Sequence, residues 1–292
     1  MRSKLHPIIL ILGLALAILP MQSQEQPPIS IEKVAGDVYC LYGQGGNIGI
    51  LEAEDALLVV DSQYARNAAA VMKAIQDMSP KPIKFLVNTH YHGDHTGGNP
   101  IIGQGAEIVS HAACKASFLK GLKPEQSEES MGAPGKTYAT EMTMQVGAET
   151  VGLIHPGPAH TSGDTIVVFE KSKVIHTGDL FFHGLPPYID VADGADTHNW
   201  FRTIDTLAKK YPDFKLIPGH GKVTDMKAWL DFSDYLKMLR EKVWAAIQGG
   251  QSREEAMESV DLSGYVNIQD MGEFLTKKNN VGWVYDEMSK QK

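Results

Sequence analysis

Hydrophobic and polar positions along the chain predict a series of strands followed by strands that alternate with helices. Short apolar or β-branched runs, separated by Gly-Asp, Gly-Gly and Glu-Asp turns, predict a meander of strands at 29–33, 38–43, 47–53 and 57–61. Residues 64–78 carry apolar positions at helical spacing, and the continuous apolar run 83–88 predicts a buried strand. A further strand and helix follow at 108–110 and 112–119.

A polar stretch at 123–136 separates these elements from a second series. This series has predicted strands at 142–146, 150–154, 165–170, 173–176 and 215–217, and predicted helices at 197–211 and 226–248. Because both halves have the same order of elements, we expect an α+β four-layer αβ/βα sandwich, with two mixed sheets packed face to face and helices outside. This domain would span 29–248, and the amphipathic, more polar residues 249–292 would form a C-terminal helical extension.

The first 24 residues follow a different pattern. Arg2, Lys4 and His6 precede an apolar run of twelve residues, 8–19, and a polar stretch follows it. Twelve residues are too few to span a bilayer, which takes about 20, and the order basic, apolar, polar is typical of a secretory signal. We therefore interpret 1–24 as a signal peptide and expect a periplasmic or secreted protein without stable membrane insertion after cleavage. A retained membrane anchor is the alternative.

Composition and charge narrow the function further. The chain has 292 residues, is 43% hydrophobic and 21% charged, and has only two cysteines, which excludes a disordered, collagen-like or disulfide-rich protein. Its net charge is -8, and no cluster of Lys and Arg would attract a phosphate backbone, so we do not expect it to bind nucleic acid. Cys40 and Cys114 are expected to be buried free thiols. The oligomeric state stays open.

Potential metal ligands gather where predicted strands end. The segments HYHGDH, GPAH, GD and PGH each follow a predicted strand, and each contains a glycine, which permits a tight turn. Side chains at i and i+2 of an extended loop face the same way, so His90 and His92 can bind one ion while Asp94 and His95, beyond the glycine bend, face a neighbouring ion. The candidate metal ligands are His90, His92, Asp94, His95, His160, Asp179 and His220.

The HYHGDH run, the later GPAHTSGD, HTGD and IPGH segments and the doubled strand series resemble the metallo-β-lactamase superfamily over 29–244. The resemblance implies that His90, His92 and His160 bind a first metal ion. It further implies a second ion at Asp94, His95 and His220, with Asp179 bridging both. A zinc pair is the usual cofactor of this superfamily, and some members use iron or manganese.

The chemistry that follows is hydrolysis of a small-molecule substrate. A hydroxide bridging two zinc ions would attack a carbonyl-centred bond of a lactam, lactone, ester or thioester, and Asp94 would orient it and transfer a proton to the leaving group. Broad-range lactamases of the family have Cys where Asp179 stands and Lys three residues later, where this chain has Phe182. This departure weakens the expectation of lactam hydrolysis. The segment around Asp179 and Phe182 is most similar to a poorly defined branch of exported members.

Two other functions remain open at this point. One is a mononuclear iron dioxygenase that acts on persulfides, which resembles the same ligand set but uses fewer of the ligands. The other is a non-catalytic metal-binding accessory of a periplasmic redox pathway. The metal content separates the first of these from the hydrolase, and a broad substrate panel separates the second.

Other residues are candidates for supporting roles. Side chains that could orient the ligating imidazoles are Asp61, Thr89, Thr96 and Thr161. Histidines that we expect to be satisfied polar groups rather than ligands are His111, His155 and His176, whereas His183 and His198 could line the pocket. An apolar wall for a substrate is suggested by Phe181, Phe182, Tyr188 and Trp200, which fit a core equally well.

Overall fold

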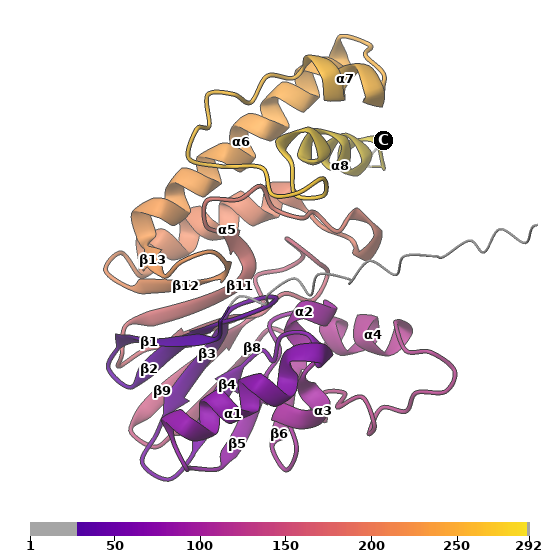
Figure 1. Cartoon of the computed structure of the whole chain (residues 1–292). Helices are drawn as coiled ribbons and strands as arrows, with labels where there is room; N and C mark the ends of the chain where they lie inside the picture. Colours follow the sequence, from indigo (N-terminus) through magenta and orange to yellow (C-terminus); the bar gives the residue numbers. More distant parts are fainter. Residues whose placement is uncertain (1–27, 291–292) are drawn as a thin grey trace, which may run out of the picture.

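Two β-sheets packed face to face form the centre of the molecule in the computed structural model, which describes residues 28–290 (Figure 1). Helices cover the outer face of each sheet, which confirms the predicted αβ/βα sandwich. The predicted signal peptide, 1–24, lies outside the described residues. Within 28–290, none of the helices combines the length and the apolar character that crossing a membrane requires.

The first sheet has seven strands in sequence order. Its first four strands pair antiparallel, as a meander joined by short turns permits, and the remaining pairs are parallel. The strands are β1 (Ser30–Ala35), β2 (Val38–Tyr42), β3 (Ile48–Glu52), β4 (Leu57–Val60), β5 (Ile83–Val87), β6 (Glu107–His111) and β7 (Lys136–Tyr138). The hydrophobic pattern does not predict β7, which has three residues.

The second sheet has six strands in the order β13-β12-β11-β10-β9-β8. All its pairs are antiparallel except β11 with β12. The strands are β8 (Glu141–Val146), β9 (Glu149–Ile154), β10 (Ile166–Phe169), β11 (Val174–Phe182), β12 (Lys215–His220) and β13 (Thr224–Asp225). A parallel pair needs a crossover connection, and here the chain between β11 and β12 contains a helix that packs on the outer face.

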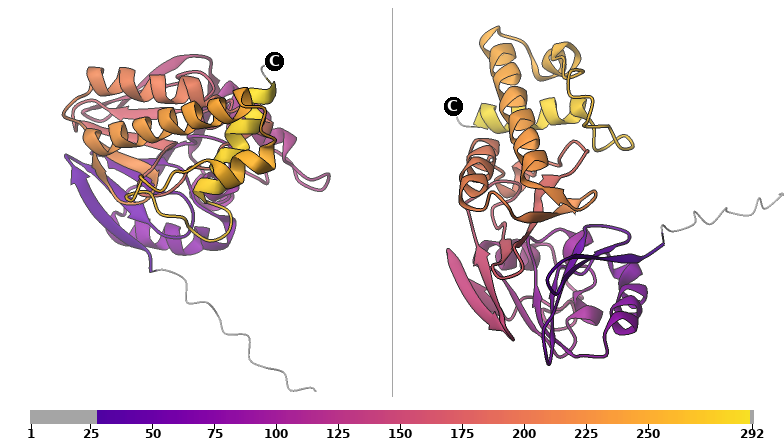
Figure 2. Two further views of the ribbon diagram at one scale, coloured as in Figure 1. Left: turned by 90° about the horizontal axis from the view of Figure 1, so that it is seen from above. Right: turned by 90° about the vertical axis from the view of Figure 1, so that its left-hand side faces the viewer.

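The helices fall into two groups that lie on opposite sides of the sheets (Figure 2). The first sheet carries α1 (Ala68–Met78), α2 (Gly93–Thr96), α3 (Asn99–Ile102) and α4 (Ala112–Lys120), with the 3-10 turn η1 (Ala65–Asn67) before them. The second sheet carries η2 (Val191–Asp193), α5 (Thr197–Lys210), α6 (Met226–Gln248), α7 (Arg253–Ser259) and α8 (Lys277–Lys290).

Three apolar clusters hold the four layers together. Between the sheets, alternate strand residues such as Val60, Leu153 and Val167 are fully buried. A second cluster joins the first sheet to α1, and a third joins the second sheet to α5, α6 and α8. Each buried aliphatic or aromatic side chain stabilises the fold by about 1.5–3 kcal/mol relative to its exposed state. The two cysteines are both buried and unbonded.

Two predicted strand ends are wrong in a way that matters for the site. The pattern predicts strands at 173–176 and 215–217 with Asp179 and His220 in loops, but β11 and β12 continue through both residues. The polar HTGD segment has the composition of a turn. It nevertheless lies within β11, whose register with β12 shifts at Gly178, where φ is +51°, and Leu180, Phe181 and Phe182 beyond it are buried in the cluster under α5 and α6.

The C-terminal extension shares the core of the preceding residues. Val281 and Val284 of α8 belong to the same apolar cluster as the second sheet. Arg240 on α6 forms an ion pair with Glu287 on α8, Nη1 to Oε1 at 2.6 Å; Glu287 is buried, and the Arg240 side chain is 13% exposed. The hydroxyl of Tyr235 donates to Asn280 Oδ1 at 2.7 Å. Residues 249–290 are therefore packed onto the domain rather than folded as a separate unit.

Candidate metal centre

The candidate ligands of the HYHGDH segment are placed by the end of β5 and the start of α2. His90 and His92 lie in the loop after β5, and Asp94 and His95 lie in the first turn of α2. Backbone N–H groups of His95 and Thr96 donate to the carbonyl of His92, which fixes the bend between the two pairs of ligands. The loop thus turns its first two side chains and its last two in different directions.

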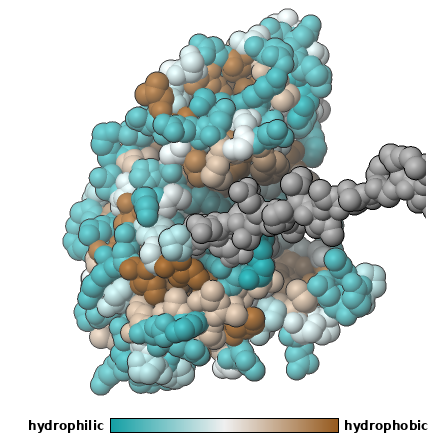
Figure 3. Space-filling model, in the orientation of Figure 1, coloured by the Kyte–Doolittle hydropathy of each residue, from teal (hydrophilic) through white to brown (hydrophobic). Residues whose placement is uncertain are grey.

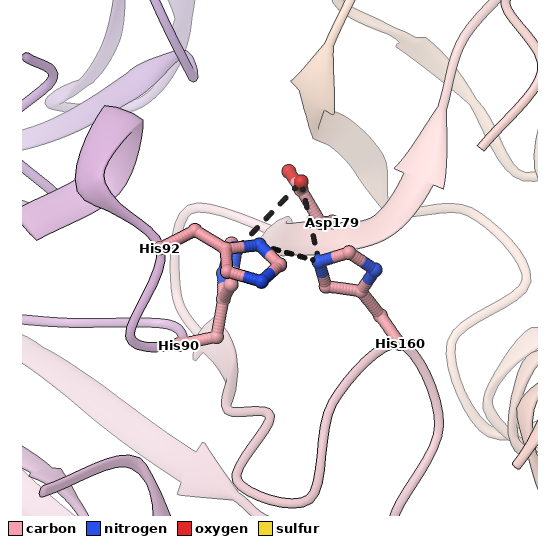
Figure 4. A group of neighbouring side chains, drawn as sticks. All are labelled: His90, His92, His160 and Asp179. Atoms are coloured by element: carbon pink, nitrogen blue, oxygen red, sulfur yellow. Dashed lines mark hydrogen bonds and ion pairs between the residues drawn. The ribbon is translucent and has the colours of Figure 1, made fainter. Parts of the chain in front are cut away.

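One set of nitrogen and oxygen atoms gathers beside Asp179, within β11. His90, His92, His160 and Asp179 form this first set, and Figure 4 shows their side chains converging from three segments of the chain. His92 Nδ1 lies 3.0 Å from His90 Nε2 and 3.1 Å from His160 Nε2. Asp179 Oδ2 lies 3.7 Å from His90 Nε2 and 3.5 Å from His160 Nε2.

A second set lies on the other side of Asp179. It consists of Asp94, His95 and His220, with Asp179 Oδ1 facing them. Asp179 Oδ1 is 3.0 Å from His95 Nε2 and 3.4 Å from His220 Nε2. Asp94 Oδ2 is 3.3 Å from His220 Nε2 and 3.7 Å from His95 Nε2. The two oxygens of one carboxylate therefore face two different groups of ligands.

These separations fit metal ions. Tetrahedral ligands at the usual Zn–N distance lie about 3.3–3.4 Å from one another, within the range that both sets span. In residues 28–290, the buried polar side-chain atoms without a hydrogen-bond partner are His95 Nε2 and Asp179 Oδ1. Buried polar atoms rarely lack a partner, and a cation would satisfy both. A Cβ at Gly219 would lie 2.0 Å from Asp179 Oδ1, so only glycine leaves this oxygen accessible.

The charges of the site also favour cations. Burial lowers the pKa of His160 to about 3, so this imidazole is neutral and can ligate at neutral pH. Burial opposes ionisation of His220 as well, but Asp179 and Asp94 outweigh it and raise its pKa to about 9. For Asp94, burial is outweighed by His95 and His220, which lower its pKa to about 2. The carboxylates thus attract positive charge to the second set, where a metal ion would replace protons.

Hydrogen bonds from the opposite ring nitrogens orient four of the imidazoles. His95 Nδ1 lies 2.7 Å from Asp61 Oδ2, and Asp61 also accepts from the backbone and hydroxyl of Thr89. His92 Nε2 lies 2.9 Å from Asp190 Oδ2, and His160 Nδ1 lies 2.8 Å from the carbonyl oxygen of Tyr188. Such contacts fix the tautomer and raise the basicity of the ligating nitrogen.

The supporting residues agree only in part with the sequence prediction. Asp61 contacts His95, and Thr89 Oγ1 lies 3.1 Å from His90 Nδ1, as expected. The prediction is wrong for Thr96 and Thr161, which do not orient a ring. The Thr96 hydroxyl donates to backbone carbonyls, and the Thr161 hydroxyl donates to Asp164. Asp190 was missed. Its only local signal is an acidic residue in an otherwise apolar PPYID segment, while its contact partner is 98 positions away.

The remaining histidines lie outside both sets. His111 and His155 stack on each other with centroids 3.6 Å apart, and His176 Nε2 contacts the carbonyl of Asn47, so all three have partners, as expected. The suggestion that His183 and His198 line the metal pocket is wrong. His183 borders a neighbouring hollow, and His198 lies on α5 against Phe201.

A cavity of about 870 Å³ opens onto the two sets. His92, Asp94, Asp179 and His220 line it. Of the aromatic residues suggested as a substrate wall, Phe182 and Tyr188 line this cavity, whereas Phe181 and Trp200 are buried in the core. A concave site with a few polar groups and a mainly apolar lining is typical of a small-molecule site.

The family model of the metallo-beta-lactamase superfamily matches residues 41–220, which include all seven candidate ligands. The chain belongs to this superfamily. The resemblance seen in the sequence is thus confirmed, and together with the two ligand sets it identifies a metal-dependent hydrolase.

Relatives and solved structures agree with this membership. A type 2 metallo-beta-lactamase of Elizabethkingia meningoseptica is 24% identical over 244 residues, covering 80% of this chain and 95% of that protein. The structure of a metallo-beta-lactamase from Pontibacter korlensis superposes with a TM-score of 0.63 at 21% identity, covering 72% of this chain and 99% of that chain. A stereoselective inverting sec-alkylsulfatase from Pseudomonas sp. superposes with a TM-score of 0.70 at 18% identity, covering 88% of this chain and 50% of that chain. Both structures share the fold.

Proposed function

We propose that the protein is an exported hydrolase that uses two zinc ions to cleave a carbonyl-centred bond, in a lactam, lactone, ester or thioester. The observation that carries the proposal is the Asp179 carboxylate, whose two oxygens face two separate groups of ligands. Asp179 would bridge the ions and reduce their mutual repulsion. A protein with one metal ion would need only the first set, and His95 Nε2 and Asp179 Oδ1 would then stay buried without a partner.

A zinc pair would supply hydroxide at neutral pH and polarise the bond under attack. The chain's own residues would do the rest. Asp94 stays ionised at neutral pH because its pKa is lowered to about 2, and it borders the cavity. It would orient the attacking water and accept its proton for transfer to the leaving group. No side-chain nucleophile is needed, and the two cysteines, both buried, do not line this cavity.

Metal analysis combined with a substrate panel tests this proposal. We expect two zinc ions per chain and hydrolysis within a panel of a chromogenic cephalosporin, a lactone, an ester, a thioester and an alkyl sulfate. The alkyl sulfate is included because an alkylsulfatase shares the fold. A single iron ion per chain with oxygen-dependent turnover of a persulfide would contradict the hydrolase and favour the dioxygenase. Two metals without any turnover would favour the accessory role.

Asp94→Asn is the sharpest variant for the chemical step. The amide retains the shape of the carboxylate but cannot accept a proton, so we expect kcat to fall by about 10²–10⁴-fold, the usual contribution of a positioned acid or base. Asp77→Asn, at an exposed position of α1, is the matched control and should leave kcat unchanged. Unaltered kcat in Asp94→Asn with both ions bound would refute the role of Asp94.

Export and the absence of nucleic acid as a partner are part of the same proposal. The basic, apolar and polar order of residues 1–24 supports export, and the net charge of -8 disfavours a phosphate backbone. Cell fractionation of the full-length chain in a bacterial host tests the first point. Retention in the cytoplasm with an intact N-terminus would contradict it.

A further inference from the structure

The C-terminal extension contributes one wall of the cavity that contains the metal centre. Met271, Phe274 and Leu275, in the segment between α7 and α8, line the cavity together with the ligands of both sets. They lie beyond residue 220, where the match to the family model ends. This wall, which we call the Phe274 wall, is therefore a feature that the common part of the superfamily does not supply.

The backbone of the Phe274 wall is held in place by hydrogen bonds. The N–H of Met271 donates to the carbonyl of Leu275 at 2.8 Å. Asn279 Nδ2 donates to the carbonyl of Phe274 at 2.8 Å, and Asn280 Nδ2 donates to that of Pro187 at 2.6 Å. The last bond ties α8 to the segment before Asp190. The wall is thus positioned before a substrate arrives, which reduces the entropy that binding would cost.

The side chains of the wall extend an apolar surface from the ligands to the mouth of the cavity. Tyr188 lies 5.4 Å from the ring of His92, and Phe274 lies 5.2 Å from Tyr188, both between centroids. Trp283 supports both rings from behind, at 5.1 and 5.3 Å. Yet 57% of Phe274 and 50% of Met271 is exposed. Figure 3 shows that apolar patches, in brown, interrupt the hydrophilic surface of the face that is turned toward the viewer.

Two basic side chains, Arg66 and Lys222, line the same cavity as the Phe274 wall. Within the part of the chain that the structure describes, neither Arg66 nor Lys222 forms an ion pair with an acidic side chain. Arg66 Nε donates to Gln44 at 3.0 Å, and Lys222 Nζ lies 4.0 Å from the centroid of Tyr42. Their charges are left available to an anionic group of a ligand.

We propose that the substrate is an amphipathic anion. Its apolar acyl or aryl group would pack against the Phe274 wall, its scissile bond would lie at the metal centre, and its anionic group would face Lys222 and Arg66. The identity of the bond that is cleaved rests on the proposed function, whereas the class of molecule rests on the cavity. Exposed apolar residues elsewhere often mark protein contacts, but these share one cavity with the metal ligands, which favours a substrate.

A chain-length series tests the apolar part. With zinc-loaded protein, KM for p-nitrophenyl esters should fall from acetate to hexanoate to decanoate, because each added CH₂ can be buried against the wall. Phe274→Ala should raise KM for the decanoate ester about tenfold, because a partly exposed aromatic contact is lost. KM for the acetate ester should stay unchanged. Val266→Ala is the matched control, since Val266 is an exposed apolar residue of the same extension that borders the neighbouring hollow instead.

A charged and a neutral substrate test the anionic part. Lys222→Gln should raise KM for the p-nitrophenyl half-ester of glutaric acid but not for p-nitrophenyl pentanoate, and zinc content should stay at the wild-type value. Lys227→Gln is the control, because Lys227 is exposed and pairs with Asp231 away from the cavity. Equal losses for both esters would mean that Lys222 supports the fold of the site rather than the charge of the substrate.

Calorimetric titration of sodium decanoate into metal-free protein separates this inference from the proposed function. Binding that Phe274→Ala weakens, without hydrolysis of any ester, would contradict the hydrolase and preserve the class of ligand. Hydrolysis with the same KM along the series, unchanged in Phe274→Ala, would overturn the inference and preserve the hydrolase. A change in oligomeric state in Phe274→Ala with unchanged KM would also overturn it, since the wall would then be a contact between copies.

Discussion

The metal centre and the C-terminal extension border the same cavity, but different forces hold them. The ligands of the metal centre are placed by short polar contacts, such as Asp61 with His95 and Asp190 with His92. The extension is held by apolar packing of α8 and by the buried pair of Arg240 and Glu287. On the two proposals above, the centre would determine the rate of the chemical step, and the extension would determine which molecules bind.

The largest effect is expected at the residue that joins the two ligand sets. Asp179→Asn removes the negative charge between the ions and converts one of its oxygens into an NH₂ group that cannot ligate. We expect metal content to fall below two ions per chain and kcat/KM to fall by at least about 10³-fold. Circular dichroism should be unchanged, since the wild-type fold is held by the apolar clusters. Full activity of Asp179→Asn with two bound ions would show that the Asp179 carboxylate does not hold the metal centre together.

A substitution that loosens the C-terminal extension should lower the stability of the fold rather than the rate of the chemical step. Glu287→Ala leaves Arg240 without its buried partner, which typically costs about 3–5 kcal/mol. We expect the free energy of unfolding in urea to fall by this amount. Among molecules that remain folded, KM should rise more than kcat falls, because the Phe274 wall is attached to α8.

Glu258→Ala is the matched control for that variant. Glu258 pairs with Lys278 on the surface of the same extension, and exposed pairs contribute only about 0–1 kcal/mol. Equal destabilisation by the two variants would show that the buried pair does not hold the extension. A fall in kcat alone in Glu287→Ala would show that the extension acts on the chemical step.

A smaller effect is expected from a residue that acts through a ligand. Asp190→Asn weakens the contact with His92 Nε2 and the one with the hydroxyl of Tyr91. Loss of such a contact typically lowers metal affinity or activity about 10–100-fold. Zinc affinity measured by competition with a chelator should fall in this variant. Asp193→Asn, which contacts Ser117 and Ser162 instead of a ligand, should keep wild-type affinity.

The smallest effect concerns the stacked pair of His111 and His155, which lies outside both regions. Burial lowers the pKa of both imidazoles, and the His155 ring, stacked at 3.6 Å, further lowers the pKa of His111. Below about pH 6.5 the unfolded chain therefore binds protons that the folded chain does not. Stability present above this pH is lost as the pH falls toward 5.

The contribution of the pair should be no more than about 1 kcal/mol after solvent screening. Urea unfolding at pH 7 and pH 5 measures it, because His155→Gln should reduce the loss while the ligands stay unchanged. An identical pH dependence in wild type and His155→Gln would show that the pair stays neutral in both states or is charged in both.

Local pattern accounts for much of the architecture. Alternation and short turns predict the meander of β1 to β4, and α6 has the bounds that its periodicity predicts. Pattern fails where tertiary contacts override it. HTGD has turn composition but lies in β11, because the apolar residues after it are buried under α5 and α6. Asp190 carries no motif, and only the fold brings it to His92.

The sequence by itself determined the two-sheet sandwich and the seven candidate ligands. Strand and helix periodicity are local properties, and clustered His and Asp beside Gly are rare enough to stand out. The tertiary structure alone decided that the two oxygens of Asp179 face two ligand sets, that Asp190 supports His92, and that the Phe274 wall borders the metal centre. These depend on distances between residues far apart in the chain, which are set by how the layers pack.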